Sequence, residues 1–107
     1  MVKINPQENH LTLINTFTVK PENQEALINL LKSATDEVFK KIDGFISASI
    51  HRGVEGTKVV NYVQWQSKEH LMAIFKNPEV QKYQKQTEPL IEKVEPVTYF
   101  VVAAQEK

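Results

Sequence analysis

The chain has no cysteine, only three glycines and one tryptophan among its 107 residues, and its charges cancel. Without cysteine it can form no disulfide, no thiolate metal site and no cysteine nucleophile. Basic and acidic residues number 13 each, so no net charge draws the chain to nucleic acid or to a lipid surface. Long apolar runs are also missing, which argues against a membrane span and a signal peptide. We therefore expect a cytoplasmic protein.

The composition is that of a folded domain, with 41% hydrophobic and 24% charged residues. A chain of this length forms one domain with a true core. No glycine-rich linker, low-complexity tract or repeat divides it. We predict a single domain over residues 1–107, with its core at about residues 10–103.

Segments with regular hydrophobic spacing succeed one another along the chain. Alternating or β-branched side chains predict strands at residues 11–19, 45–52, 58–65 and 96–104. Three- and four-residue spacing predicts helices at residues 22–42, 67–76 and, after the break at Asn77 and Pro78, 79–88. This order is the ferredoxin-like βαββαβ arrangement. We predict an α+β fold, a four-stranded antiparallel sheet with the helices on one face.

The third strand places an amide and an indole on the same face, because side chains alternate along a strand and Asn61, Val63 and Trp65 are two residues apart. Trp65 is the bulkiest of them, so we place this face under the helices. Asn15 falls on the same face of the first strand. On the second strand the alternation directs Ile46, Ala48 and Ile50 to the helices and Phe45 outward. A buried amide needs a partner or a ligand, and both interpretations of Asn61 stay open.

The other sheet face has no helix to cover it and is partly apolar. It is predicted to carry Thr12, Ile14, Thr16, Ser47, Ser49, Val60 and Tyr62. A patch of this kind favours a partner, and we predict a homodimer joined through the open sheet face. The alternative is a threonine-rich face that tolerates water.

Three stretches and the long helix between them resemble the antibiotic biosynthesis monooxygenase (ABM) domain. They read LINTFTVKP at 13–21, DGFISASIHR at 43–52 and GTKVVNYVQWQSKE at 56–69. The resemblance implies a ferredoxin-like dimer whose sheets join into a dimeric α/β barrel. Its best-understood branch oxidises phenolic polyketides to quinones with oxygen and without a flavin, haem or metal cofactor.

The resemblance also implies a site. Asn61 and Trp65 match an asparagine and a tryptophan of that branch and are the predicted catalytic residues. The substrate itself reduces oxygen as an anion, so the protein needs donors for the oxyanion and an aromatic wall. We expect the substrate-binding residues to be Asn15, Val63, Leu71 and Phe75. The branch's tyrosine and arginine fall at Leu71 and Lys85 of this chain, which is a departure from its pattern.

Other chemistries fit the sequence less well. A haem-degrading branch of the family has an asparagine where Asn15 stands, but its tryptophan and histidine positions hold Ile74 and Gln84, which disfavours haem degradation. The three histidines show no metal-ligand spacing, so we expect no metal site. RNA binding would need aromatic residues and basic surroundings on the open face. Lys82, Lys85 and Glu88 around Tyr83 are typical of a solvated helical face.

The sequence therefore predicts a cofactor-independent monooxygenase that oxidises a small hydroquinone- or anthrone-like aromatic substrate with O2. The alternative is a non-catalytic dimer of the same fold, either structural or binding a small ligand, in which Asn61 and Trp65 are core residues.

Overall fold

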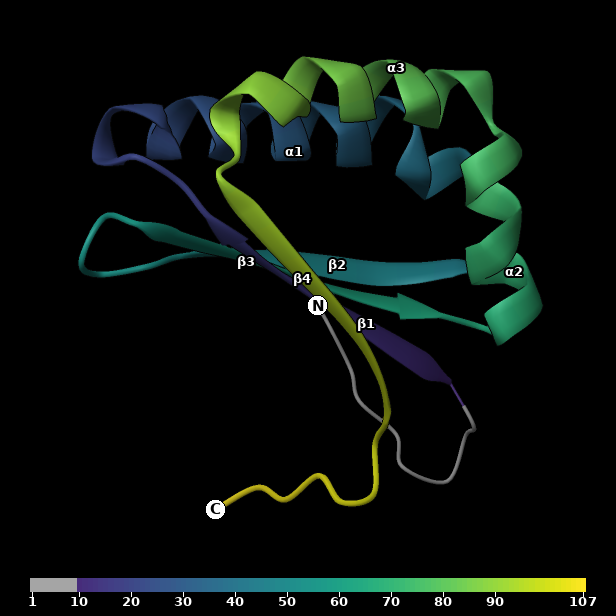
Figure 1. The fold of residues 1–107 in the computed structure, drawn as a ribbon. Coiled ribbons are helices and arrows are strands. Elements are labelled where there is room, and N and C mark those ends of the chain that lie inside the picture. The colour runs from purple at the N-terminus through teal and green to yellow at the C-terminus, as the bar shows by residue number, and fades with distance from the viewer. Residues whose placement is uncertain (1–9) are drawn as a thin grey trace.

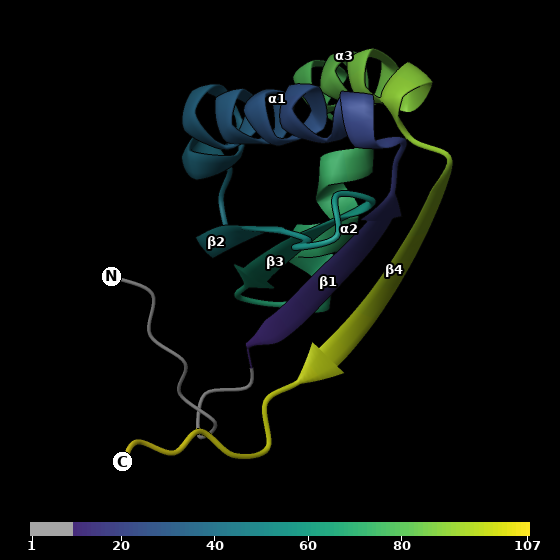
Figure 2. The ribbon, with the colours of Figure 1, turned by 90° about the vertical axis from the view of Figure 1, so that its left-hand side faces the viewer.

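A four-stranded antiparallel sheet with helices on one face forms the molecule (Figures 1 and 2). The computed structural model describes residues 10–107. The strands are β1 (Leu11–Thr18), β2 (Phe45–Arg52), β3 (Lys58–Trp65) and β4 (Lys93–Phe100), in the order β2-β3-β1-β4. The main helices are α1 (Gln24–Glu37), α2 (Lys68–Ala73) and α3 (Pro78–Thr87). The predicted α+β ferredoxin-like fold is confirmed, and no helix of the described part could cross a membrane.

The predicted long helix is divided at Val38, whose φ of −123° and ψ of −63° leave the helical region. A single 3-10 turn, Phe39–Lys41, follows it. The second helical region has the predicted break at Asn77, and each half has its own cap. The Ser67 side chain accepts from the backbone N–H of His70, and Asn77 accepts from those of Glu79 and Val80.

A β-bulge corrects the predicted orientation of Phe45. The β2–β3 register shifts between Phe45 and Ser47, so Phe45 opposes Trp65 instead of facing away from it. The extra residue, Ile46, reverses the alternation at this point. Strict two-residue periodicity could not anticipate the bulge, and the prediction for Phe45 was wrong.

Strand β4 lies earlier in the sequence than predicted, at residues 93–100 rather than 96–104. Its pairing with β1 runs from Thr18 opposite Lys93 to Leu11 opposite Phe100. Because β1 begins at Leu11, no partner strand extends beyond Phe100, and the apolar residues that follow are not in a strand. Pro96 is tolerated because β4 is an edge strand.

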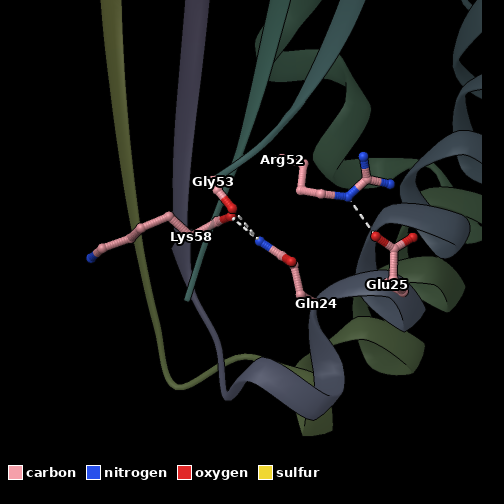
Figure 3. Close-up of polar contacts among 5 residues, drawn as sticks. All are labelled: Gln24, Glu25, Arg52, Gly53 and Lys58. Carbon is pink, nitrogen blue, oxygen red and sulfur yellow. Dashed lines mark hydrogen bonds and ion pairs between the residues drawn. The ribbon is translucent and has the colours of Figure 1, made fainter. Parts of the chain in front are cut away.

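Polar contacts attach the start of α1 to the β2–β3 hairpin (Figure 3). Gln24 Nε2 donates to the carbonyl oxygens of Gly53 at 2.9 Å and Lys58 at 3.0 Å. Beside it, Arg52 Nε donates to the carboxylate of Glu25. The Gln24 side chain is buried, so these bonds satisfy an amide that would otherwise be desolvated without a partner.

Two apolar clusters lie between the sheet and the helices. One contains Trp65 and the other contains Phe17 and Val59. The expectation that the Trp65 face lies under the helices is therefore confirmed. On the opposite face, the register aligns Tyr62, Ile14 and Val97 in a row across three strands.

Candidate functional site

A cavity of about 720 Å³ lies between the sheet and the helices. All four strands and all three main helices contribute to its wall. The β4 side of this wall is exposed, with Val94 at 47%, so the cavity opens toward that edge. Its volume lies within the range of about 300–1,000 Å³ that is typical of small-molecule sites.

Asn61 stands on β3 in the wall of this cavity, directly opposite Asn15 on β1. Its Oδ1 atom is buried, and no described residue provides a hydrogen-bond partner for it. Leaving a buried polar atom unpaired costs about 1–3 kcal/mol. Rotating the carboxamide by half a turn would exchange the oxygen for the NH₂ group at this position. The site therefore offers a ligand either an acceptor or a donor, and Asn15 places a second amide beside it.

Trp65 provides a second buried and unpaired polar atom in the described part of the wall. Its side chain is 1% exposed, yet the buried Nε1 has no partner among the described residues. The ring is held edge-on by Phe39 and Phe45, with centroid separations of 6.4 and 5.7 Å. Such T-shaped contacts fix the plane of an indole. The N–H is thus a rigid donor beside the cavity.

The remaining residues predicted to contact a substrate also line the cavity, from three different elements. Val63 on β3 and Leu71 on α2 are buried in its wall. Phe75 contributes to the lining but is 49% exposed, so the prediction that it faces inward is only half right. It lies in the 3-10 turn after α2, where the chain leaves the core. The cavity brings together all six residues predicted for the site.

Tyr83 on α3 also lines the cavity, and the sequence interpretation missed it. Its hydroxyl donates to Glu37 Oε2 at 2.7 Å, across 46 residues of sequence. This hydrogen bond raises the pKa of Tyr83 above its usual value, so the phenol stays neutral. The signal in the sequence was the spacing of Val80, Tyr83, Gln84 and Thr87, which is that of an inward helix face.

Charged residues occupy the periphery of the site. Glu88, Glu92 and Lys93 line the cavity but are exposed. Lys85 does not line the cavity and lies in a shallow hollow with Pro78 on the outer side of α3. Within residues 10–107, no three histidine or acidic side chains gather to hold a metal ion. The inner wall is therefore apolar and carries a few neutral polar groups.

This arrangement suits a flat aromatic molecule with oxygen substituents. Apolar side chains can enclose its rings, and the unpaired atoms of Asn61 and Trp65 can bond its oxygens. The Trp65 N–H, and the Asn61 NH₂ group once the carboxamide is rotated, can donate to developing negative charge, but neither neutral group can remove a proton.

Comparisons with known proteins agree with this description. Residues 10–86 match the family model described as antibiotic biosynthesis monooxygenase. The tetracenomycin-F1 monooxygenase of Streptomyces glaucescens is 36% identical over 83 residues, covering 78% of this chain and 74% of that one. A monooxygenase from the gene ActVA-Orf6 of Streptomyces coelicolor, solved with nanaomycin D, superposes with a TM-score of 0.82 at 26% identity, covering 96% of each chain. SnoaB, a cofactor-independent oxygenase of Streptomyces nogalater, shares the fold, with a TM-score of 0.75 at 17% identity over 92% of this chain and 99% of that one.

Proposed function

The chain belongs to the antibiotic biosynthesis monooxygenase family, and from that premise we propose that it is a cofactor-independent monooxygenase acting on an anthrone- or hydroquinone-like aromatic compound. The observation that carries the proposal is the pair of unpaired buried polar atoms, Asn61 Oδ1 and Trp65 Nε1, at a cavity of ligand size. The names of the relatives support the reaction class: one is a tetracenomycin-F1 monooxygenase and another was solved with nanaomycin D.

The proposed reaction uses the substrate as its own reductant. An anthrone-like substrate loses a proton, and its electron-rich anion adds O2 at the ring CH₂ carbon. One oxygen atom stays on that carbon as the quinone carbonyl. The other leaves as water with the two hydrogens of the CH₂ group, so no external reductant is consumed. With its carboxamide rotated by half a turn, Asn61 donates from its NH₂ group to the oxyanion, while Trp65 orients the ring and donates its N–H.

The remaining wall residues position the rings in this proposal. Val63, Leu71 and Phe75 supply apolar contacts, and Asn15 bonds a second ring oxygen. Leu71 also replaces the tyrosine of the best-understood branch, so α2 contributes no hydroxyl at that position. We infer that residues of β1 and β3, rather than residues of α2, form the hydrogen bonds with the oxygen substituents of the substrate.

Oxygen uptake tests the proposal. Purified protein mixed with anthrone in the presence of a metal chelator is expected to consume O2 and form anthraquinone faster than the uncatalysed oxidation. Asn61→Ala is expected to lower the rate at least about tenfold, since one oxyanion donor contributes about 10²–10³ in known cases. Asn29→Ala, at an exposed position on α1, is the matched control. Unchanged turnover in the Asn61 variant would remove its proposed role.

A second candidate function follows from the departures at Leu71 and Lys85. Lys85 stands at the sequence position that the resemblance assigns to the branch's arginine, but it does not line the cavity. A dimer that binds aromatic ligands without turning them over fits the same wall. Ligands that raise the melting temperature in the absence of any oxygen uptake would favour this function over the first.

We also propose that the open sheet face joins two copies of the chain. Tyr62, Ile14 and Val97 align across β3, β1 and β4, with Val97 46% exposed. Charge placed in this row is expected to separate the copies because an unpaired charge is costly in an interface. Sedimentation should show a dimer for the native chain and a monomer for Val97→Lys, while Asn29→Lys, at an exposed position on α1 in the helix layer, serves as the control. A native chain that sediments as a monomer would refute the dimer.

A further inference from the structure

The proposed oxidation passes through an anion, and the groups proposed to stabilise it include no base to create it. Asn15, Asn61 and Trp65 are neutral at any working pH. Among the described residues, the titratable side chains of the lining are Tyr83, Glu88, Glu92 and Lys93. Tyr83 packs against the cluster that contains Trp65. We therefore consider Tyr83 as the group that takes part in proton transfer at this end of the cavity.

Tyr83 connects this part of the cavity with an exposed carboxylate. Its side chain is half-buried and lines the wall, while its hydroxyl donates to Glu37 Oε2 at 2.7 Å. Glu37 is the last residue of α1, is exposed and is not part of the lining. A tyrosine hydroxyl that donates its one hydrogen still has lone pairs to accept another hydrogen bond. If a substrate hydroxyl donates to Tyr83 Oη, the pair forms a path of two hydrogen bonds from the substrate to solvent.

We propose that Tyr83 and Glu37 form a proton relay that ionises the substrate, with Tyr83 as a further catalytic residue and Glu37 as the terminal acceptor. This inference rests on the proposed oxidation. The substrate's phenolic or enolic O–H bond breaks as its proton passes to Tyr83 Oη, and the electron pair stays on the substrate. The original Tyr83 proton moves to Glu37 Oε2 in the same step. Glu37 then releases it to water, so tyrosine ends neutral and no oxidant is needed.

The charges around the pair are consistent with a neutral tyrosine that conducts protons. The carboxylates of Glu37 on α1 and Glu79 on α3 both act on the Tyr83 hydroxyl, and each disfavours tyrosinate. Asp36, the neighbour of Glu37, is paired with Lys40 at 2.9 Å. Glu37 is therefore the carboxylate in direct contact with the phenol.

Two isosteric variants separate the relay from a structural role. Glu37→Gln keeps an acceptor for the Tyr83 hydroxyl but cannot take up a proton, and Tyr83→Phe keeps the ring. Each is expected to lower kcat at neutral pH about a hundredfold, the lower part of the range for general base catalysis. Glu37→Gln should leave KM within about threefold. Its rate should recover at alkaline pH, where the substrate ionises without help. Asp36→Asn is the matched control and should retain the native rate and pH profile.

Ligand binding tests the contact with Tyr83 independently of turnover. The probes are a dihydroxynaphthalene, with one hydroxyl on each ring, and its monomethyl ether, titrated calorimetrically. The native chain should bind the dihydroxy compound about threefold to tenfold more tightly, the value of one neutral hydrogen bond. Tyr83→Phe should bind the two compounds equally.

The outcomes distinguish this inference from the proposed oxidation. A native rate and pH profile in Glu37→Gln, or retained discrimination between the probes in Tyr83→Phe, would overturn the relay. Lost discrimination in Tyr83→Phe without any oxygen uptake by the native chain would support the Tyr83 contact and overturn the oxidation. Binding of neither probe would overturn both.

Discussion

The Trp65 side chain is fully buried, and its N–H has no hydrogen-bond partner among the described residues. Replacing it with phenylalanine changes both the packing and the unpaired N–H, and the two changes have opposite effects on stability. Trp65→Phe removes part of a ring packed against Phe39 and Phe45 but also removes a polar atom that costs about 1–3 kcal/mol to bury alone. These effects oppose each other, so we expect a net loss of about 1–2 kcal/mol in unfolding free energy. Oxygen uptake should fall at least about tenfold. Urea denaturation followed by circular dichroism measures the first quantity. A stability loss of the size expected for Trp65→Ala, about 3–5 kcal/mol, would show that removing the unpaired N–H does not offset the lost packing.

Gly44 holds the turn before β2 in a conformation that other residues rarely adopt, with φ at 86°. A Cβ atom at this position would lie 2.2 Å from Cγ of His70. We expect Gly44→Ala to lower the unfolding free energy by about 2 kcal/mol or more, from backbone strain together with the clash. Gly56, with φ at 91° and open space around it, is the control that isolates strain. Equal losses in the two variants, measured by urea denaturation, would show that the His70 contact contributes nothing.

At the scale of whole elements, α3 depends on its cap. Asn77 Oδ1 accepts from the N–H groups of Glu79 at 2.9 Å and Val80 at 3.4 Å, and Pro78 occupies the first helical position. Asn77→Ala is expected to lower the unfolding free energy by about 1 kcal/mol. Asn77→Asp should preserve it, since aspartate caps equally well and complements the helix dipole. Thermal or urea unfolding compares the two variants, and a larger loss in the aspartate variant would refute the capping role.

The sequence predicted most elements because each had a local signal. β2 and β3 have their predicted bounds, and the breaks at Ser67 and Asn77 coincide with real caps. The errors arose where pairing between strands, rather than the local sequence pattern, determines the structure. β4 ends at Phe100 because its partner β1 begins at Leu11, and no property of the apolar residues after Phe100 indicates this.

The candidate site was predictable in part for the same reason. Asn61 and Trp65 share a strand face by simple alternation, whereas Phe45 reaches them through a bulge. The Tyr83–Glu37 pair joins helices whose bonded residues are 46 positions apart. A contact of that kind depends on how α3 crosses α1, which spacing within one helix does not determine.

For the molecule as a whole, pH should limit stability at both extremes. Hydrogen bonding to Arg52 lowers the pKa of Glu25, and hydrogen bonds to its own backbone N–H and to Ser67 lower that of Glu69. A carboxyl group whose pKa is lowered in the folded state stabilises the fold at pH values above its unfolded pKa, ordinarily 4.5. This contribution is lost as the pH falls through the folded pKa. The raised pKa of Tyr83 contributes below its ordinary value of 10.0 and is lost as pH rises above it.

Melting temperature measured against pH checks this expectation. We expect a plateau around neutrality and a decline on either side. Glu25→Gln should flatten the acid side, and Tyr83→Phe should flatten the alkaline side. Because the Glu25–Arg52 pair is exposed, added salt should reduce the part of the acid-side decline in melting temperature that this pair causes. A profile unchanged in both variants would show that other groups govern the pH dependence.

The position of the chain's single tryptophan gives the protein a built-in optical signal. Trp65 is the one indole among 107 residues, and it stands in the cavity wall. Light absorbed selectively by indole therefore reports from this place alone. An aromatic ligand that stacks nearby should quench or shift the emission, so its binding and release can be timed in unlabelled, unmodified protein.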